Sequence, residues 1–189
     1  MEKSLIIAGF GVQGVMVIGQ LLTYTAAETT EKKVTFFPSY GAEQRGGTAN
    51  CYVVISDKDI GSPKVNRADY LVVLNQPSMD RFASAVKNGS TVFVNSSIVK
   101  SIPEYDDVTV VPVDAGNIAI ALGNQKVMNL VMVGAIIGYT QLLPAGNVLH
   151  TAFKKLGAKR PELNSLNEEA FTRGMLIGES YRKRAVSQH

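Results

Sequence analysis

Three glycines near the start of the chain have the spacing of a phosphate-binding turn. Gly9, Gly11 and Gly14 form the pattern G-x-G-x-x-G in "GFGVQG", after an apolar run and before a run of helical length. Glycines allow a tight turn and close approach of a ligand to the backbone, and a helix N-terminus offers free N–H groups to an anion. We therefore treat these glycines, together with the polar Gln13, as candidate cofactor-binding or cleft-facing residues.

A complete dinucleotide site needs more than this turn. An Asp or Glu at the end of the second strand normally holds a ribose hydroxyl, but here that strand ends in "VTFFPSYG" and the next acid is Glu43. Three interpretations stay open: anion binding, a tight strand–helix junction, and full dinucleotide binding.

The stretch "FFPSYGAEQRGGTANC" (Phe36–Cys51) is a second candidate, because glycines and charges are concentrated in it. Pro38 disfavours continuation of a central strand, and the glycines permit positive φ, so the chain can fold back on itself. Arg45 offers a forked donor to a carboxylate or phosphate. Glu43 can pair with a cation of a partner protein. It can also pair with Arg45, and that internal pair would only brace the turn.

A catalytic role for this stretch has little support, since Ser39 and Tyr40 have no histidine near them in the sequence. The polar residues Asn75 and Gln76 follow another apolar strand and could face a cleft. Ser78 and Asp80 lie at the start of the next helix, where a structural cap is their default interpretation. Because α/β sheets carry functional loops at the carboxyl ends of their strands, the two loops could line one crevice.

The elements that must position these residues alternate between strand and helix. The sequence predicts strands at Ser4–Phe10, Lys33–Phe37, Ala49–Asp57, Asp69–Asn75, Asn88–Ser96 and Asp107–Asp114. It predicts helices at Val15–Thr30, Pro77–Lys87, Ala115–Gly123, Val127–Leu143, Asn147–Gly157 and Asn164–Arg184. This order favours an α/β fold, a Rossmann-like three-layer sandwich with a mostly parallel sheet, room for one antiparallel strand pair, and a helical C-terminal part.

Composition excludes several classes of site. Cys51 is the only cysteine, so an internal disulfide and a cysteine-ligated cluster within this chain are excluded, and its place in an apolar run predicts a buried strand residue. The formal charge of +3 is too small to indicate nucleic-acid binding. We expect no secretory signal, and therefore a cytoplasmic protein.

The most apolar segment, Val127–Leu143, is short for a membrane span and contains Asn129 and Gln141. It predicts a buried helix rather than a membrane span. Its small residues Gly134, Ala135 and Gly138 should let a neighbouring element approach closely.

Taken together, the motifs resemble a known family. "GFGVQG", "PSYGAEQRGGTANCYVVISDKDIGSP" and "ADYLVVLNQPSMDRF" are similar to the gamma subunit of 2-oxoacid:ferredoxin (or acceptor) oxidoreductases, most closely the 2-oxoglutarate type, also called 2-ketoglutarate synthase. The resemblance implies a single gamma-type domain over 1–189, with a C-terminal arm at about 162–189. The family's first turn reads G-x-G-G-Q-G. Val12 departs from it, and we expect its side chain to narrow the turn.

The resemblance also implies a division of labour. The complex would use thiamine diphosphate, Mg, iron–sulfur clusters and coenzyme A, held mainly by alpha, beta and ferredoxin-like delta partners, with electrons passing to ferredoxin or another low-potential acceptor. This chain alone would bind none of these cofactors and would be inactive. Its implied subunit-contact loop comprises Ser39, Tyr40, Gly41, Glu43, Gln44, Arg45, Gly46 and Gly47.

Two alternatives remain. The chain could be a stand-alone nucleotide-binding α/β protein that uses the Gly9–Gly14 turn. It could also belong to an indolepyruvate or branched-chain 2-oxoacid oxidoreductase, whose related subunits carry a similar glycine turn.

Overall fold

A computed structural model describes residues 1–40, 48–158 and 160–187. The strands are β1 (Glu2–Phe10), β2 (Lys33–Tyr40), β3 (Thr48–Ser56), β4 (Ala68–Val73), β5 (Val86–Asn95) and β6 (Val108–Val113). The α-helices are α1 (Val15–Thr29), α2 (Gln76–Phe82), α3 (Ala115–Ala121), α4 (Met128–Thr140), α5 (Ala145–Ala152) and α6 (Asn164–Val186). Short turns of other helix types are η1 (Gly11–Gln13), η2 (Gln125–Val127), η3 (Phe153–Gly157) and η4 (Pro161–Leu163).

The strands form one sheet in the order β2-β3-β1-β4-β5-β6. β1, β4, β5 and β6 pair in parallel, while β3 runs antiparallel to both β1 and β2. A mostly parallel sheet with an antiparallel exception is what the sequence predicted. Because β3 is antiparallel to both of its neighbours, β2 runs in the same direction as β1. Both β1 and β2 therefore end at the same edge of the sheet.

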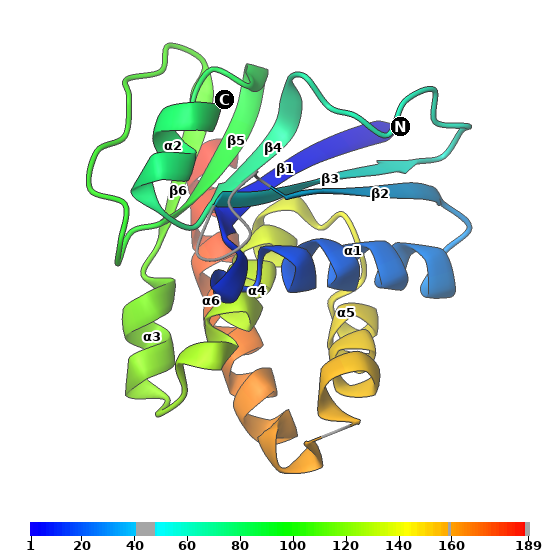
Figure 1. Cartoon of the computed structure of the whole chain (residues 1–189), viewed down its shortest axis with the longest axis vertical. Helices are drawn as coiled ribbons and strands as arrows, with labels where there is room; N and C mark the ends of the chain where they lie inside the picture. Colours follow the sequence, from blue (N-terminus) through cyan, green and yellow to red (C-terminus); the bar gives the residue numbers. More distant parts are fainter. Residues whose placement is uncertain (41–47, 159, 188–189) are drawn as a thin grey trace.

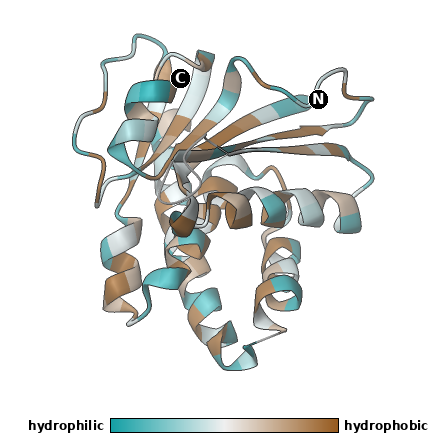
Figure 2. Cartoon of the chain, viewed as in Figure 1, coloured by the Kyte–Doolittle hydropathy of each residue, from teal (hydrophilic) through white to brown (hydrophobic). Residues whose placement is uncertain are grey.

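Both faces of the sheet are covered, because successive apolar side chains of β1 from Leu5 to Ala8 point to opposite faces and are all buried. Leu5 and Ile7 belong to a large core shared with α1, α4, α5 and α6. Ile6 and Ala8 point to the other face and pack in a smaller core with α2. Figure 1 shows α1, α4, α5 and α6 below the sheet and α2 above it, and Figure 2 shows hydrophobic residues running along the strands between these layers. The predicted three-layer architecture is confirmed.

The tightest helix packing joins α4 to α6 through glycines on both helices. A side chain at Gly134 or Gly138 would collide with the backbone carbonyl of Phe171 or Met175 on α6. In return, a side chain at Gly174 would collide with the Val131 carbonyl on α4. The small-residue face predicted for the apolar helix therefore receives a neighbouring helix at backbone contact distance.

Two expectations about local structure were wrong. The helix predicted over Pro77–Lys87 ends at Phe82, because Val86 already pairs with Ala68 and begins β5. β2 continues through Pro38 to Tyr40, although proline is unfavourable in a central strand. β2 is an edge strand, where the missing N–H costs little.

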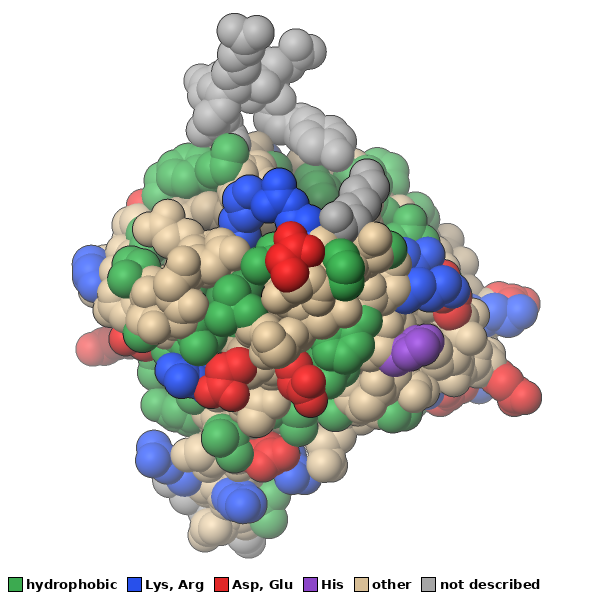
Figure 3. All heavy atoms as spheres, turned by 90° about the horizontal axis from the view of Figure 1, so that it is seen from below, with side chains coloured by type: hydrophobic (Ala, Val, Ile, Leu, Met, Phe, Trp, Pro, Cys, Tyr) green, Lys and Arg blue, Asp and Glu red, His purple; other side chains and the backbone are tan. Residues whose placement is uncertain are grey.

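The helices of the described residues include none that is both long and apolar enough to cross a membrane. The most apolar one, α4, has 13 residues and packs within the large core. Seen from below in Figure 3, the helical side of the molecule carries hydrophobic side chains between charges of both signs. This mixed surface agrees with the small net charge.

Candidate functional site

The glycine turn has the strand–turn–helix context that its spacing predicted. β1 ends at Phe10, η1 follows, and Gly14 adopts φ 83° before α1 begins. Gly14 is required by this left-handed conformation, and a side chain there would also meet the Asn129 amide at 2.9 Å. A side chain at Gly9 would lie 2.8 Å from Leu74 Cβ. Two of the three glycines thus serve the turn and its packing, whereas the position of a side chain at Gly11 faces open space.

Gln13 braces this turn with its side chain. Its Oε1 accepts hydrogen bonds from Phe10 N at 2.8 Å and from Asn75 Nδ2 at 2.9 Å. Its Nε2 donates to Leu74 O at 3.2 Å. The structure therefore brings together the turn after β1 and the residues after β4, which were separate candidates in the sequence.

Asn75 and Gln76 are both engaged in structural hydrogen bonds. Asn75 is the N-cap of α2, where its Oδ1 accepts from Ser78 N at 2.9 Å, so the cap is Asn75 and not Ser78 as the sequence suggested. Gln76 Oε1 accepts from the backbone N–H groups of Lys100 and Ser101 at 2.9 and 3.0 Å. These contacts tie the start of α2 to the segment after β5 and fix the geometry of this edge.

The subunit-contact loop of the sequence analysis lies mostly outside the described residues: Gly41, Glu43, Gln44, Arg45, Gly46 and Gly47. Its ends are placed by the sheet. Tyr40 pairs with Ala49, and Ala49 also pairs with Gly9 on β1. Ser39 pairs with Asn50. The two strands that flank the loop therefore end beside the glycine turn.

A hollow of about 390 Å³ opens next to this turn. It is lined by Val12, Gln13, Ser97, Ile98, Gly116, Asn117, Ile120, Gln125 and Met128. Val12, whose side chain we expect to narrow the turn, is 92% exposed and lines this hollow. Sequence reasoning missed Ile98 and Ile120. The sequence could have indicated both residues by their position, because Ile98 follows the carboxyl end of β5 and Ile120 lies in the helix that follows the carboxyl end of β6.

On one wall of the hollow, hydrogen bonds join Ser97 and Asn117 to the Asp114 carboxylate. Ser97 Oγ lies 2.7 Å from Asp114 Oδ1 and accepts from Gly116 N at 2.8 Å. Asn117 Nδ2 donates to the same carboxylate at 2.9 Å. Ser97 thus holds the start of α3 through its hydroxyl, which bonds both the Asp114 carboxylate and the Gly116 N–H.

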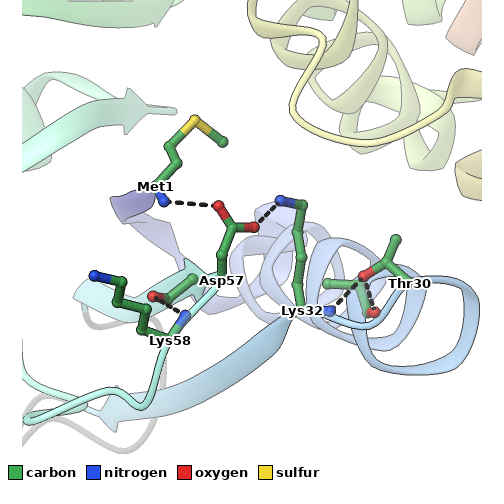
Figure 4. Close-up of polar contacts among 7 residues, drawn as sticks. Met1, Thr30, Lys32, Asp57 and Lys58 are labelled. Carbon is green, nitrogen blue, oxygen red and sulfur yellow. Dashed lines mark hydrogen bonds and ion pairs between the residues drawn. The ribbon is translucent and has the colours of Figure 1, made fainter.

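Two carboxylates outside the hollow, Asp57 and Asp69, form ion pairs within the fold. Asp57 lies between Lys32 Nζ and the Met1 amino group, each at 2.6 Å (Figure 4). The hydrogen bond from Lys32, followed by that from Met1, lowers the pKa of Asp57 to about 2. At the opposite edge from the glycine turn, burial acts to raise the pKa of Asp69, but hydrogen bonds from Lys87 and Ser4 outweigh it, so this pKa is lowered.

Cys51 is buried in β3, as predicted. Its thiol is fully shielded and lies 3.7 Å from Val15 O. Burial raises its pKa to about 12, so the thiol is no nucleophile at neutral pH. Within the described part of the chain, histidine, cysteine and acidic residues form no group of three suited to a metal ion.

Comparison with known proteins identifies the family. Residues 4–177 match the family described as pyruvate ferredoxin/flavodoxin oxidoreductase. The chain belongs to this family. The match includes the glycine turn, the β2–β3 strands, α4 and most of α6, so it spans all three layers of the fold.

Two relatives within this oxidoreductase family differ in length. The chain is 42% identical over 137 residues to ketoisovalerate oxidoreductase subunit VorA of Methanothermobacter thermautotrophicus, covering 72% of this chain but 28% of that protein. It is 33% identical over 177 residues to 2-oxoglutarate synthase subunit KorC of Methanocaldococcus jannaschii, covering 92% of each. The same unit therefore occurs both within a long polypeptide and as a chain of this size.

Solved structures have the same fold. The gamma subunit of a keto/oxoacid ferredoxin oxidoreductase from Geobacter sulfurreducens superposes with a TM-score of 0.84 at 22% identity, covering 96% of this chain and 98% of that one. The 2-oxoglutarate:ferredoxin oxidoreductase from Magnetococcus marinus, with 2-oxoglutarate, coenzyme A and succinyl-CoA bound, gives a TM-score of 0.86 at 20% identity. There the match covers 95% of this chain and 31% of the other.

Proposed function

We propose that this chain is the gamma subunit of a multisubunit 2-oxoacid:acceptor oxidoreductase and is inactive alone. The observation that carries the proposal is the end-to-end similarity to a 2-oxoglutarate synthase subunit, which covers 92% of both chains. The assembled cytoplasmic enzyme would catalyse the coenzyme A-dependent oxidative decarboxylation of a 2-oxo acid. Thiamine diphosphate, Mg and iron–sulfur clusters would lie on the alpha, beta and delta partners, with ferredoxin or another low-potential compound as acceptor.

The substrate that we propose is 2-oxoglutarate, converted to succinyl-CoA. The name of the full-length relative supports this choice. The branched-chain alternative is favoured by the higher identity, 42%, to a ketoisovalerate oxidoreductase subunit over a shorter region. Assays of the purified complex with 2-oxoglutarate and with 2-oxoisovalerate decide between them. Higher kcat/KM on 2-oxoisovalerate would replace our assignment.

In this proposal the chain presents the carboxyl edge of its sheet to the partners. Support comes from Gln13, which holds the glycine turn against Asn75, and from the pairing of Tyr40 and Gly9 with the same residue of β3. The contact loop begins from this edge. Glu43 and Arg45 are proposed to form inter-subunit ion pairs, which matter more when desolvated than on a free surface. α6, the main part of the C-terminal arm, would supply interface area as well as core.

Purification from the native source tests the subunit assignment. We expect larger thiamine- and cluster-binding chains to co-purify with a tagged copy of this chain. Recovery of a free monomer or simple homo-oligomer at native expression levels would contradict the proposal.

Arg45→Ala should reduce assembly or coupled activity while leaving the melting temperature of the lone chain unchanged. The opposite result, a lower melting temperature with normal assembly, would favour an internal brace.

A stand-alone nucleotide-binding function is the second candidate. It is favoured by the open space at Gly11, where a ligand could approach the turn. Calorimetric titration of the isolated chain with NAD, FAD, AMP and coenzyme A tests it. Tight dinucleotide binding with turnover by the lone chain would reverse our ranking, whereas absent binding would favour the subunit role.

A further inference from the structure

Three large aliphatic side chains stand exposed around the hollow beside the glycine turn. Val12 on η1 is 92% exposed, Ile120 on α3 is 57% exposed, and Ile98 after β5 is 43% exposed. Single exposed aliphatic residues are ordinary on a protein surface. Three from separate segments around one concavity are characteristic of a binding surface. We call these three residues and the hollow the edge patch.

The chemistry of the hollow favours an uncharged occupant. Among the lining residues that the structure describes, the polar ones are amides and a hydroxyl: Gln13, Ser97, Asn117 and Gln125. Ser97 and Asn117 are already bonded to Asp114. A phosphate-bearing ligand in the hollow would find no lysine or arginine among these lining residues, and it would lie near that carboxylate. Apolar side chains of another protein suit the lining better.

The edge patch is built on braced segments. Gln13 fixes η1 to the residues after β4, and Ser97 fixes the segment after β5 to the start of α3. Ile98 is adjacent to Ser97, and its N–H bonds to Asn95 O at 3.2 Å. Because the surface is organised before binding, docking would cost little conformational entropy.

The longer relatives indicate what covers such a patch. In one of them the matching region is 28% of the polypeptide, and in a structural neighbour it is 31%. A unit that is joined to further protein in some relatives and separate in others needs a surface for that protein. We propose that the edge patch docks the partner subunit that corresponds to the remainder of the longer relatives. The inference rests on the proposed subunit function and assigns its contact surface to Val12, Ile98 and Ile120.

The test uses the complex co-expressed from its native genes. Ile120→Asp and, separately, Ile98→Asp place a carboxylate in the patch at exposed positions, where the lone chain should still fold. Tyr24→Asp is the control, because Tyr24 on α1 is 39% exposed, does not line the hollow and lies outside the segments proposed for the interface. We expect each patch variant to reduce recovered partner at least about tenfold, as loss of a central apolar contact does. The control should retain wild-type recovery. Carbene footprinting should label Ile98 and Ile120 in the lone chain and not in the complex.

The outcomes separate the two proposals. Normal assembly of both patch variants, or equal labelling with and without partner, overturns the edge patch and leaves the subunit function standing. Failure of the wild-type chain to recover any partner overturns both. A wild-type homodimer that Ile120→Asp converts to monomer would identify a second copy as the occupant. Protection of the patch in the lone chain by coenzyme A would identify a ligand instead. Either result overturns the partner assignment.

Discussion

Asn75 Nδ2 donates a hydrogen bond to Gln13 Oε1 over 2.9 Å, although the residues are 62 positions apart in the sequence. The same oxygen accepts from Phe10 N, and Asn75 in turn caps α2. One amide pair therefore joins the glycine turn to the loop after β4. Gln13 thus has a structural role in holding this turn.

Gln13→Ala should lower the free energy of unfolding by about 1–3 kcal/mol, because it leaves buried or partly buried hydrogen-bonding groups without a partner. Urea unfolding followed by circular dichroism measures the change. Gln20→Ala, at an exposed position of α1, is the control and should be neutral or slightly stabilising. Equal effects of the two substitutions would mean that the Gln13 bonds add nothing to stability.

Gly138→Ala should destabilise the chain by about 1–3 kcal/mol or more, since the new methyl group would collide with the Met175 carbonyl and force α4 and α6 apart. Gly146→Ala provides a control of opposite sign. Gly146 lies in α5 with open space around it, so alanine should raise the free energy of unfolding by about 0.5–1 kcal/mol. Thermal denaturation compares the two, and a stabilised Gly138→Ala would refute the close approach.

The Cys51 thiol should react with a thiol reagent only when the chain opens. Its burial and raised pKa predict labelling at pH 8 about a thousandfold or more slower than that of an exposed cysteine. In a Gln20→Cys variant, one thiol should react fast and the other slowly, and urea should accelerate only the slow phase. Two fast phases in the native protein would contradict the buried position.

Asp57→Asn should lower stability at pH 6 and lose its effect in acid. The folded-state pKa is lowered from 3.8 to about 2 by Lys32 and the Met1 amino group. The carboxylate therefore stabilises the fold above pH 3.8, and this contribution is lost as pH falls toward 2. Urea unfolding at pH 6, 4 and 3 measures the narrowing difference from wild type. Asp59→Asn, which removes a carboxylate from the same exposed turn, is the control.

Several features could be predicted from the sequence because they depend on local pattern. Strand-like apolar runs alternate with segments of helical spacing, and this order indicated the α/β class. The G-x-G-x-x-G pattern after a strand indicated the turn before α1. Pro77 indicated where α2 begins. The small residues of the apolar helix anticipated its close contact with α6, although not which helix would fill that face.

Other features depended on the tertiary structure. No local signal in the sequence shows that β3 lies antiparallel between β1 and β2. Nor does one show that β2 is an edge strand, which can include Pro38, or that Val86 begins β5. Each is decided by pairing between distant segments. For the same reason Gln13 meets Asn75, and Val12 meets Ile98 and Ile120, only once the parallel strands bring their carboxyl ends to one edge. The sequence by itself determined the elements and the chemistry available at their ends; sheet order decided which of those ends are neighbours.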